Sequence, residues 1–466
     1  MVLDDTIAAI STPAGQGGIG IVRISGKDAI RIADKVFRAP TLKKLSQSPS
    51  HRILYGHVIN GGKEDIIDEA LVSVMRGPRT YTREDVVEIN CHGGAVPVRS
   101  VLEAVLKNGA RLAEPGEFTR RAFLNGRIDL AQAEAVLDVI NSLTVQSQKS
   151  SLAQLRGTLS EKIEAIRNET AELTAFVEAH IDFPEEDIQS IDRNDMTQRA
   201  ARIRQSLVKL IRGARYGMIL REGLKTAIIG RPNVGKSSLL NALLDHDRAI
   251  VTEMPGTTRD VIEEYLNVEG LPLKIMDTAG IRSVEDIAEK EGVRRSLQSM
   301  EDADLVLLLL DGSEELHRTD KELMSKSENK KRIVVINKSD LPQKIIPPRP
   351  PLKKGGWGDY RNNLITISAK QGTGLEMLRK EIVKAALQGQ QEPSSVEVVT
   401  NVRHVRALEK ALASLDSFTD EADRKTSPEF LSVELGEALN AIGEIVGITT
   451  SDDILNRIFS NFCIGK

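Results

Sequence analysis

Residues 230–237 read Gly-Arg-Pro-Asn-Val-Gly-Lys-Ser, a pattern in which small residues surround one lysine and one serine. Glycines at this spacing let backbone N–H groups wrap a phosphate chain, while Lys236 reaches the outer phosphates and the Ser237 hydroxyl binds Mg²⁺. An apolar run at residues 226–229 precedes the pattern, and a helical sequence follows it. The segment therefore predicts a phosphate-binding loop between a strand and a helix.

Four further motifs follow in the order of a guanine-nucleotide domain. They supply a switch threonine, a carboxylate near Mg²⁺ with a flexible glycine, a carboxylate for guanine, and a loop that closes over the base, at residues 256–260, 277–280, 337–340 and 368–370. The carboxylate of Asp340 can accept the paired N–H donors of guanine, which adenine lacks. Five elements in this order make chance improbable, so the sequence predicts a GTP-binding domain.

The residue after the second of these motifs departs from the Ras pattern. Ile281 stands where Ras-like hydrolases carry the glutamine that orients the attacking water, and an apolar side chain cannot do this. Acidic residues that could replace it are Glu285, Asp286, Glu289 and Glu291. From residue types alone, an ordinary charged helix start is the better explanation of this group. The motifs also indicate no arginine finger, the residue that neutralises phosphate charge in related enzymes. A monovalent cation near the phosphates is one substitute for that charge.

The elements that must position these residues indicate a multidomain chain with α/β and α+β parts. Apolar runs alternate with helical stretches over residues 223–385, which predicts an inserted Ras-like P-loop G domain with a doubly wound, mostly parallel sheet. Residues 1–120 mix short β-like runs with glycine clusters, which predicts an N-terminal α+β domain. Residues 121–222 and 386–466 lack strand signals, so we expect two parts of one helical domain that meet in space.

Two patterns stand out in the first helical part. Apolar side chains recur at steps of three and four, which predicts one face of a long helix, at Leu152, Leu155, Leu159, Ile163 and Ile166. Residues 193–225 carry nine Lys and Arg against two Asp and Glu. A solvated helix face is the simpler interpretation of this charge, and an RNA-facing patch is the alternative.

Composition excludes several classes of protein. The 466 residues include 63 Lys and Arg against 67 Asp and Glu, so the net charge of −4 offers no globally polycationic surface. Nine Phe, five Tyr and one Trp disfavour modules that stack RNA bases on aromatic platforms. The two cysteines, Cys91 and Cys463, lie far apart, which argues against a disulfide scaffold or a zinc ribbon and fits a reducing compartment.

Targeting and membrane signals are also missing from the sequence. The longest apolar run, at residues 305–310, has the length of a buried strand rather than of the roughly 18 residues that a membrane span needs. Residues 1–5 form neither a basic signal region nor an Arg-rich presequence. We therefore expect a cytoplasmic protein without a membrane partner.

Together with these motifs, both ends of the chain resemble the MnmE family of tRNA-modification GTPases, also called TrmE. The resemblance covers essentially the whole chain and is carried by residues 5–9, 17–26, 115–119, 122–135 and 462–466. The terminal Phe-Cys-Ile-Gly-Lys is the most specific of these segments, because general GTPases have no reason to end in this way.

The resemblance implies a concrete activity. Family members work with the flavoprotein MnmG, which carries FAD, to place an aminomethyl or carboxymethylaminomethyl group on carbon 5 of the tRNA wobble uridine. The one-carbon unit comes from a tetrahydrofolate, in the 5,10-methylene or 5-formyl form. The protein is expected to be a homodimer that joins MnmG in a heterotetramer or larger complex, with the N-terminal domain serving in folate binding and dimerisation.

The resemblance also implies roles for the residues of the G domain. K⁺ would be held by Asn233 and by the loop residues Thr252, Met254 and Thr257, and would supply the charge of an arginine finger. Mg²⁺ would sit on Ser237 and Thr258, and the water-orienting glutamate falls on Glu289. The full set expected at the nucleotide is Asn233, Val234, Gly235, Lys236, Ser237, Ser238, Thr252, Glu253, Met254, Pro255, Gly256, Thr257, Thr258, Asp277, Thr278, Ala279, Gly280, Asn337, Lys338, Asp340, Ser368, Ala369 and Lys370.

The folate contacts implied by the resemblance are Arg23, Glu88, Arg127 and Lys466. This set suits the ligand, because the glutamate tail of a folate needs cations and the N–H donors of its pterin edge suit a carboxylate. Many relatives carry Lys at position 127. Cys463 is a candidate for the modification chemistry, since a thiolate can attack an activated pyrimidine. A purely structural role in the tail deserves nearly equal weight.

Two other functions stay open at this stage. A regulatory GTPase of ribosome assembly or translation would also carry an apolar residue after Asp277-Thr278-Ala279-Gly280, although no RNA-binding domain is visible after residue 385. Alternatively, the N-terminal domain is itself a folate-dependent one-carbon transferase and the GTPase is regulatory. A measurement of folate binding by residues 1–120 distinguishes the regulatory GTPase, which would not bind folate, from the two folate-dependent functions.

Overall fold

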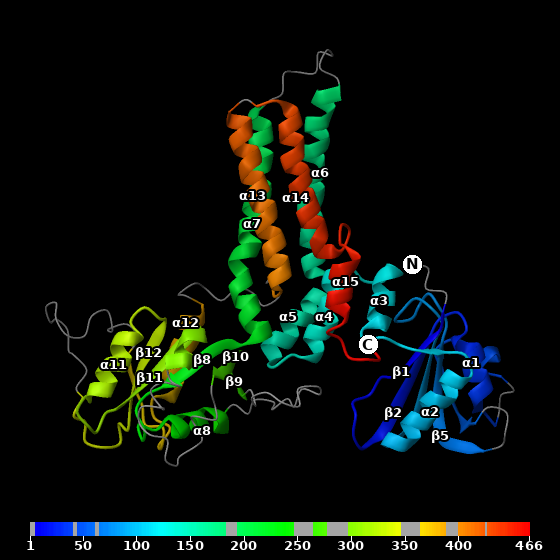
Figure 1. Ribbon diagram of the computed structural model, residues 1–466, viewed down its shortest axis with the longest axis horizontal. Helices are drawn as coiled ribbons and strands as arrows, with labels where there is room; N and C mark the ends of the chain where they lie inside the picture. The colour runs from blue at the N-terminus through cyan, green and yellow to red at the C-terminus, as the bar shows by residue number, and fades with distance from the viewer. Residues whose placement is uncertain are drawn as a thin grey trace. The chain divides into compact units, whose positions relative to one another are not determined.

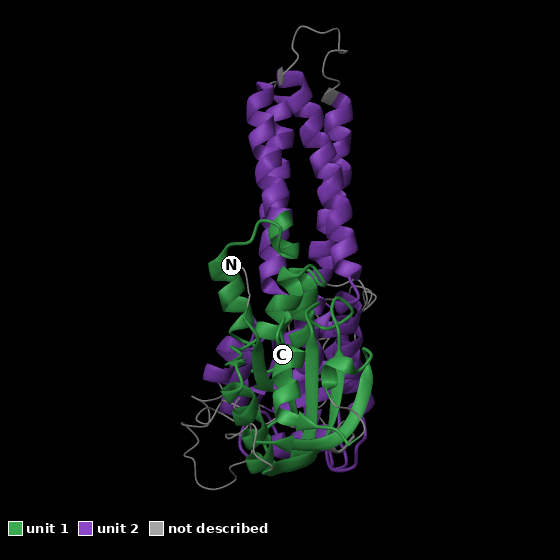
Figure 2. Ribbon diagram, turned by 90° about the vertical axis from the view of Figure 1, so that its right-hand side faces the viewer, with its two compact units in different colours: residues 1–137, 443–466 green, residues 138–442 purple. Residues whose placement is uncertain are grey.

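The computed structural model describes residues 5–40, 44–60, 65–182, 193–246, 264–276, 297–345, 364–387, 399–424 and 426–466. The chain divides into two compact units, and each is described by itself (Figure 2). Unit 1 comprises residues 1–137 and 443–466, so the last residues of the chain return to the N-terminal unit. Unit 2 comprises residues 138–442.

Unit 1 is built on a seven-stranded sheet with the order β3-β4-β5-β6-β2-β1-β7. Its strands are β1 (Ile7–Ile10), β2 (Gly17–Ser25), β3 (Phe37–Arg38), β4 (Arg52–Ile59), β5 (Ile66–Met75), β6 (Val86–Gly93) and β7 (Arg111–Leu112). Neighbouring strands run antiparallel except β1 and β7. The register of β2 on β6 places Arg23 directly opposite Glu88.

Helices close one face of this sheet. The elements of unit 1 outside the sheet are α1 (Ala29–Val36), the short 3₁₀ helix η1 (Leu45–Gln47), α2 (Ala95–Lys107), α3 (Glu117–Leu124), most of α4 (Leu130–Ile140) and α15 (Asp452–Phe459). Alternate residues of the central strands pack against α1 and α2, so that Val22 and Ile24 lie in one core with Ile32 and Val101. This alternation follows from the two-residue period of a strand that has one covered face.

Unit 2 holds a six-stranded sheet with the order β13-β12-β11-β8-β10-β9. Its strands are β8 (Leu224–Ile229), β9 (Glu264–Val268), β10 (Leu271–Met276), β11 (Leu305–Asp311), β12 (Arg332–Asn337) and β13 (Leu364–Thr366). All neighbouring pairs are parallel except β9 with β10, which forms an antiparallel edge. The predicted doubly wound, mostly parallel sheet is therefore confirmed.

Both faces of this sheet are covered, which explains the unbroken apolar sequence of β11. Leu307 and Leu309 pack into a core with helices α8 (Lys236–His246) and α12 (Leu375–Ala386). Leu308 and Leu310 point to the other face and pack with α11 (Arg318–Lys326). A strand buried on both faces cannot alternate apolar and polar residues, and it reads as one apolar run.

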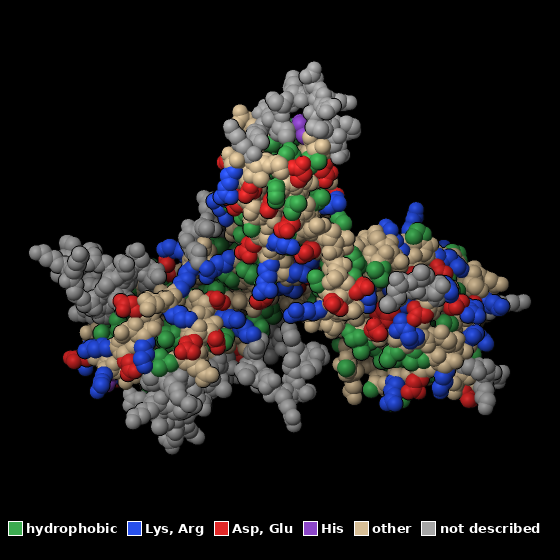
Figure 3. Space-filling model, turned by 45° about the horizontal axis from the view of Figure 1, so that its top comes forward, with side chains coloured by type: hydrophobic (Ala, Val, Ile, Leu, Met, Phe, Trp, Pro, Cys, Tyr) green, Lys and Arg blue, Asp and Glu red, His purple; other side chains and the backbone are tan. Residues whose placement is uncertain are grey.

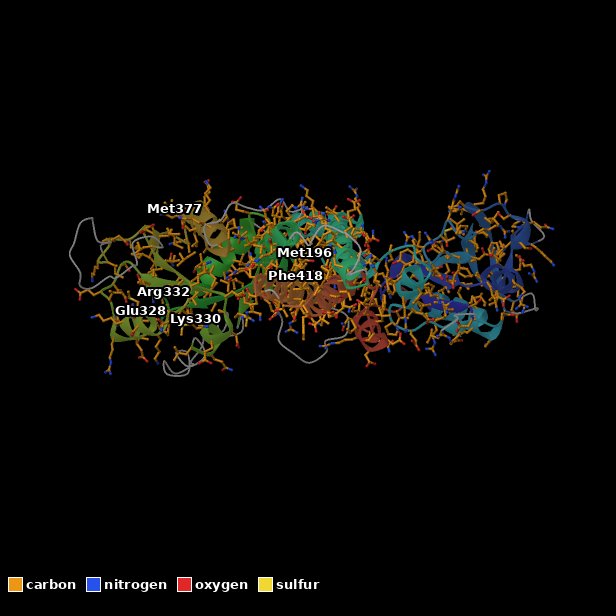
Figure 4. The ribbon with its side chains drawn as sticks, turned by 90° about the horizontal axis from the view of Figure 1, so that it is seen from above. Met196, Glu328, Lys330, Arg332, Met377 and Phe418 are labelled. Atoms are coloured by element: carbon orange, nitrogen blue, oxygen red, sulfur yellow. The ribbon has the colours of Figure 1, made fainter. Side chains whose placement is uncertain are left out.

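The remaining helices of unit 2 form an elongated bundle (Figure 1). They are α5 (Val145–Leu155), α6 (Thr158–Asp182), α7 (Arg193–Glu222), α13 (Val402–Asp423) and most of α14 (Pro428–Val446). α13 lies alongside α7, so the helical segments before and after the sheet lie side by side. Met196 of α7 and Phe418 of α13 are fully buried in this bundle (Figure 4).

One expectation for the bundle is wrong. The apolar residues from Leu152 to Ile166 do not lie on a single long helix, because α5 ends at Leu155 and α6 begins at Thr158. The chain turns at Arg156 and Gly157, where Gly157 has a φ of 96°. Only the α6 part of the pattern is buried: Leu159, Ile163 and Ile166 lie in the core, whereas Leu152 of α5 is exposed and Leu155 is partly buried.

Within the described parts of the chain, no helix combines the length and the apolar character needed to cross a membrane.

Candidate nucleotide and cofactor sites

The predicted phosphate-binding loop joins the end of β8 to the start of α8. Asn233 adopts a left-handed conformation with a φ of 64°, and Gly235 has a φ of 99°. A Cβ atom on Gly235 would lie 2.3 Å from Nδ2 of Asn337, so only glycine fits here. The loop leads directly into the N-terminus of α8, and the positive end of a helix favours an anion.

Lys236 lies at the first position of α8 and bends back over this loop. Its Nζ donates hydrogen bonds to the carbonyl oxygens of Gly230 and Arg231, each at 2.8 Å. Burial lowers the pKa of Lys236. An ammonium that donates to neutral carbonyls in a buried position gains strongly from an incoming phosphate.

The motif at the end of β12 connects the phosphate loop to the base-side loop. The buried amide of Asn337 donates from Nδ2 to the Val234 carbonyl at 2.8 Å and accepts at Oδ1 from the Ala369 N–H at 3.0 Å. One side chain therefore ties together loops that are more than a hundred residues apart.

Asp340 lies exposed at the same edge of the sheet. Its Oδ1 accepts a hydrogen bond from the Ser368 hydroxyl at 2.6 Å, and this bond holds the pKa of Asp340 below its usual range. The carboxylate is thus ionised and oriented as the acceptor of paired N–H groups. Lys370 is exposed next to it, whereas Lys338 pairs with the buried carboxylate of Asp311.

Ser237 and Ser238 follow Lys236 in the first turn of α8. The other residues predicted for this site lie outside the described residues, namely Thr252, Glu253, Met254, Pro255, Gly256, Thr257, Thr258, Asp277, Thr278, Ala279, Gly280 and Glu289.

The second predicted site lies in unit 1, and the structure brings its residues together. Nε of Arg23 donates to Oε1 of Glu88 at 2.8 Å across β2 and β6. The same guanidinium donates from its NH1 to the Gly465 carbonyl at 3.1 Å, and Ser11 donates to that carbonyl at 3.1 Å. The end of the chain is therefore docked against the middle of the sheet.

Lys466 joins this cluster from the docked tail. Burial lowers the pKa of its ammonium, the charge of Arg23 lowers it further, and Glu88 opposes both. Two cations thus share one carboxylate. A further anion at this place would relieve their mutual repulsion.

Arg127 completes the set through an aromatic ring. Its guanidinium lies 4.7 Å from the centroid of the Tyr81 ring, and its NH1 donates to the Tyr81 carbonyl at 3.1 Å. Arg23 lies 5.7 Å from the same ring. Tyr81 therefore links the two arginines, and burial raises the pKa of its hydroxyl.

Sequence reasoning did not single out Tyr81. The ring is held in place by the loop between β5 and β6, whose Glu84 accepts hydrogen bonds from the fully buried Arg121 and from Ser25. In the sequence, Tyr81 is an aromatic residue between two threonines in a polar loop. Such residues are common, so this pattern does not indicate a binding site.

The two cysteines differ in their surroundings. Cys91 is buried in the sheet of unit 1, and burial together with the charge of Asp68 raises the pKa of its thiol to about 11. Cys463 is exposed, and its backbone carbonyl accepts hydrogen bonds from Gly116 at 3.4 Å and Lys466 at 3.3 Å. The tail that carries Cys463 is thus fixed at its backbone while the thiol stays accessible.

Comparison with known proteins places both units in one family. A family profile described as the MnmE helical domain matches residues 130–463, and one described as the GTP-binding protein TrmE N-terminus matches residues 6–127. The chain is 48% identical over 467 residues to the tRNA modification GTPase MnmE of Alkaliphilus oremlandii, covering 100% of both chains. It is 49% identical to the protein of that name from Ligilactobacillus salivarius, covering 99% of this chain and 98% of the relative. A third such protein, from Geobacillus thermodenitrificans, is 48% identical over 99% of each chain. On this full-length similarity, the chain belongs to the MnmE family of tRNA modification GTPases.

Proposed function

We propose that this chain is a K⁺-activated GTPase that works with a flavoprotein partner on the wobble uridine of tRNA. The product would be 5-carboxymethylaminomethyl or aminomethyl uridine, and the one-carbon unit would come from a tetrahydrofolate. Relatives that match along the whole chain are named tRNA modification GTPases, so this chain is assigned GTP hydrolysis in tRNA modification. The same full-length similarity disfavours a regulatory GTPase of ribosome assembly.

The geometry of unit 2 supports the nucleotide part of the proposal. Lys236 would meet the outer phosphates, and the ionised carboxylate of Asp340 would read guanine. Mg²⁺ would be held by Ser237 and Thr258, where it would neutralise phosphate charge. K⁺ would be held by Asn233 with Thr252, Met254 and Thr257, and Glu289 would orient water.

K⁺ dependence has a direct test in the rate of GTP turnover. We expect the rate to rise at least about tenfold when NaCl is replaced by KCl at equal ionic strength, because the cation takes the place of an arginine finger. Replacement of Asn233 by Ala should remove most of that difference. Equal rates in the two salts would contradict the role of K⁺.

The folate part rests on one observation, the assembly of Arg23, Glu88, Arg127 and Lys466 in unit 1. Three cations would hold the glutamate tail and Glu88 would accept from the pterin N–H groups. The bound tetrahydrofolate would supply the one-carbon unit, while FAD would reside on the MnmG partner. A homodimer is part of the proposal, as the resemblance implies.

Binding of 5-formyltetrahydrofolate to the full chain tests this site. Arg23→Met should weaken binding at least about tenfold, because it removes both the pairing cation and the tail contact. Arg99→Met is the matched control, since Arg99 is an exposed residue of α2 whose ion pair in the structure is with Glu103 of the same helix. A wild-type chain that binds no folate would contradict the folate part and would favour a regulatory GTPase.

A further inference from the structure

The outer face of α7 carries a row of cations. Exposed Lys and Arg side chains lie within roughly half of the helix circumference, at Arg202, Arg204, Lys209, Arg212 and Arg215. Residues 198–218 contain no Asp or Glu. From Arg202 to Arg215 the row extends about 20 Å, at 1.5 Å of rise per helical residue.

Most of these cations lack a partner among the residues that the structure describes. Nε of Arg204 pairs with Oδ1 of Asp416 at 2.6 Å. Arg202, Lys209, Arg212 and Arg215 form no ion pair and no side-chain hydrogen bond with any other residue that the structure describes. Figure 3 shows Lys and Arg side chains, interspersed with Asp and Glu, on the lower half of the helical bundle as seen from that side.

Lys331, from the G domain, lies near the C-terminal end of this row of cations, close to Arg215. Lys331 immediately precedes β12, beside Lys330 and Arg332, which Figure 4 labels. Its Nζ is buried and has no hydrogen-bond partner among the described residues. Its pKa is lowered by burial and by the neighbouring charge of Arg215. Two like charges are thus held close together, an arrangement that an incoming anion would stabilise.

We propose that the outer face of α7, with Arg215 and Lys331 at its base, binds the sugar-phosphate backbone of tRNA. This inference rests on the proposed function and names the surface that would hold its substrate. On the same side of the helix, Gln198, Ala201 and Gln205 are exposed, whereas Val208 is partly buried. A protein interface would present an apolar centre here, and base recognition would need aromatic rings. From Arg202 to Arg215 no exposed side chain is apolar or aromatic, so contact with phosphates is favoured.

The test removes three of the unpaired cations from the full-length protein. The variant is Lys209→Gln with Arg212→Gln and Arg215→Gln, and the probe is an unmodified transcript of a tRNA with a wobble uridine. The dissociation constant is measured over a range of KCl concentrations. We expect affinity to fall at least about tenfold and the slope of log K against log salt to shrink by roughly 2 to 3. GTP turnover should stay at the wild-type rate.

A matched control removes the same amount of charge elsewhere in unit 2. It is Lys380→Gln with Lys384→Gln and Arg424→Gln, three exposed cations that pair with Glu376, Glu381 and Glu421. This control should bind the transcript like the wild type. An equal loss in both variants would show a general effect of net charge and would overturn the proposal.

The variant Lys331→Met distinguishes a role of Lys331 in tRNA binding from a role in the stability of the fold. Because this ammonium is buried and has no partner in the described part of the chain, its removal should raise the melting temperature or leave it unchanged while tRNA affinity falls. A lower melting temperature with unchanged tRNA affinity would mark Lys331 as structural and contradict its part in the site.

Three further outcomes would overturn the surface itself. They are a wild-type chain that does not bind the transcript, a triple variant that binds it with the wild-type slope, and a triple variant that loses only the protein partner. The last outcome would show that α7 binds an acidic surface of a protein partner instead of tRNA. The proposed function fails separately, if cells without this protein keep their modified wobble uridines.

Discussion

Gly465 offers the sharpest perturbation of the candidate folate site, because it docks the tail that carries Lys466. Its φ is 97°, a conformation that strains other residues by about 1–3 kcal/mol. A Cβ here would lie 2.3 Å from the Ile10 carbonyl oxygen and 2.9 Å from Cα of Ser11. Both neighbours are backbone atoms that cannot swing aside, so Gly465→Ala must displace the tail.

The cost of this displacement follows from the contacts that are lost. The Gly465 carbonyl accepts hydrogen bonds from Ser11 and Arg23, each at 3.1 Å and each worth about 1 kcal/mol net. With the backbone strain, the docked state loses about 3–5 kcal/mol, which is roughly a hundredfold to several thousandfold in population. Affinity for 5-formyltetrahydrofolate should fall by at least about a hundredfold, as titration calorimetry on the full chain can measure.

The melting temperature separates this effect from unfolding. It should change little in Gly465→Ala, because only the last residues leave their place. Gly436→Ala is the matched control, since no atom lies within 4 Å of the added Cβ and the folate affinity should be unchanged. Wild-type folate affinity in Gly465→Ala would refute the role of the docked tail.

Three further predictions concern single side chains. Asp340→Asn should shift nucleotide preference from GTP towards xanthosine triphosphate in a competition assay, because the amide matches the altered base; no shift would count against guanine recognition. Asn337→Ala should lower the free energy of unfolding by about 2–4 kcal/mol in urea titrations, since it leaves the Val234 carbonyl and a buried N–H without partners. Iodoacetamide should label Cys463 of the native protein at pH 8 while Cys91 stays unmodified, because burial and a pKa of about 11 keep the Cys91 thiol protonated until the pH approaches that value. Mass spectrometry that finds equal labelling of both thiols would contradict this difference.

The elements of the G domain could be predicted because their signals are local. A strand buried on both faces reads as an apolar run, as β11 does, and a phosphate loop needs glycines at fixed positions. The break at Gly157 could not be predicted, because the apolar period continues from α5 into α6. Local periodicity identified the buried face of α6, but it did not show that the helix ends before Gly157, and in α5 it pointed to the exposed Leu152.

The residues of the site in unit 1 could not be identified from their types and spacing in the sequence. Arg23 by itself looks like a surface charge, and only a family resemblance drew attention to it. The role of Arg23 depends on its hydrogen bond to the carbonyl of Gly465, which lies more than four hundred residues later in the sequence. Tyr81 was missed for the same reason, since its link between Arg23 and Arg127 exists only in three dimensions.

Modification of the tRNA wobble uridine is the activity that we propose for this chain. Mass spectrometry of nucleosides from tRNA of cells that lack the protein tests it most directly. We predict that 5-carboxymethylaminomethyl and aminomethyl uridines disappear, that the wild-type chain restores them, and that Arg23→Met does not. Unchanged amounts of both nucleosides in cells without the protein would contradict the account.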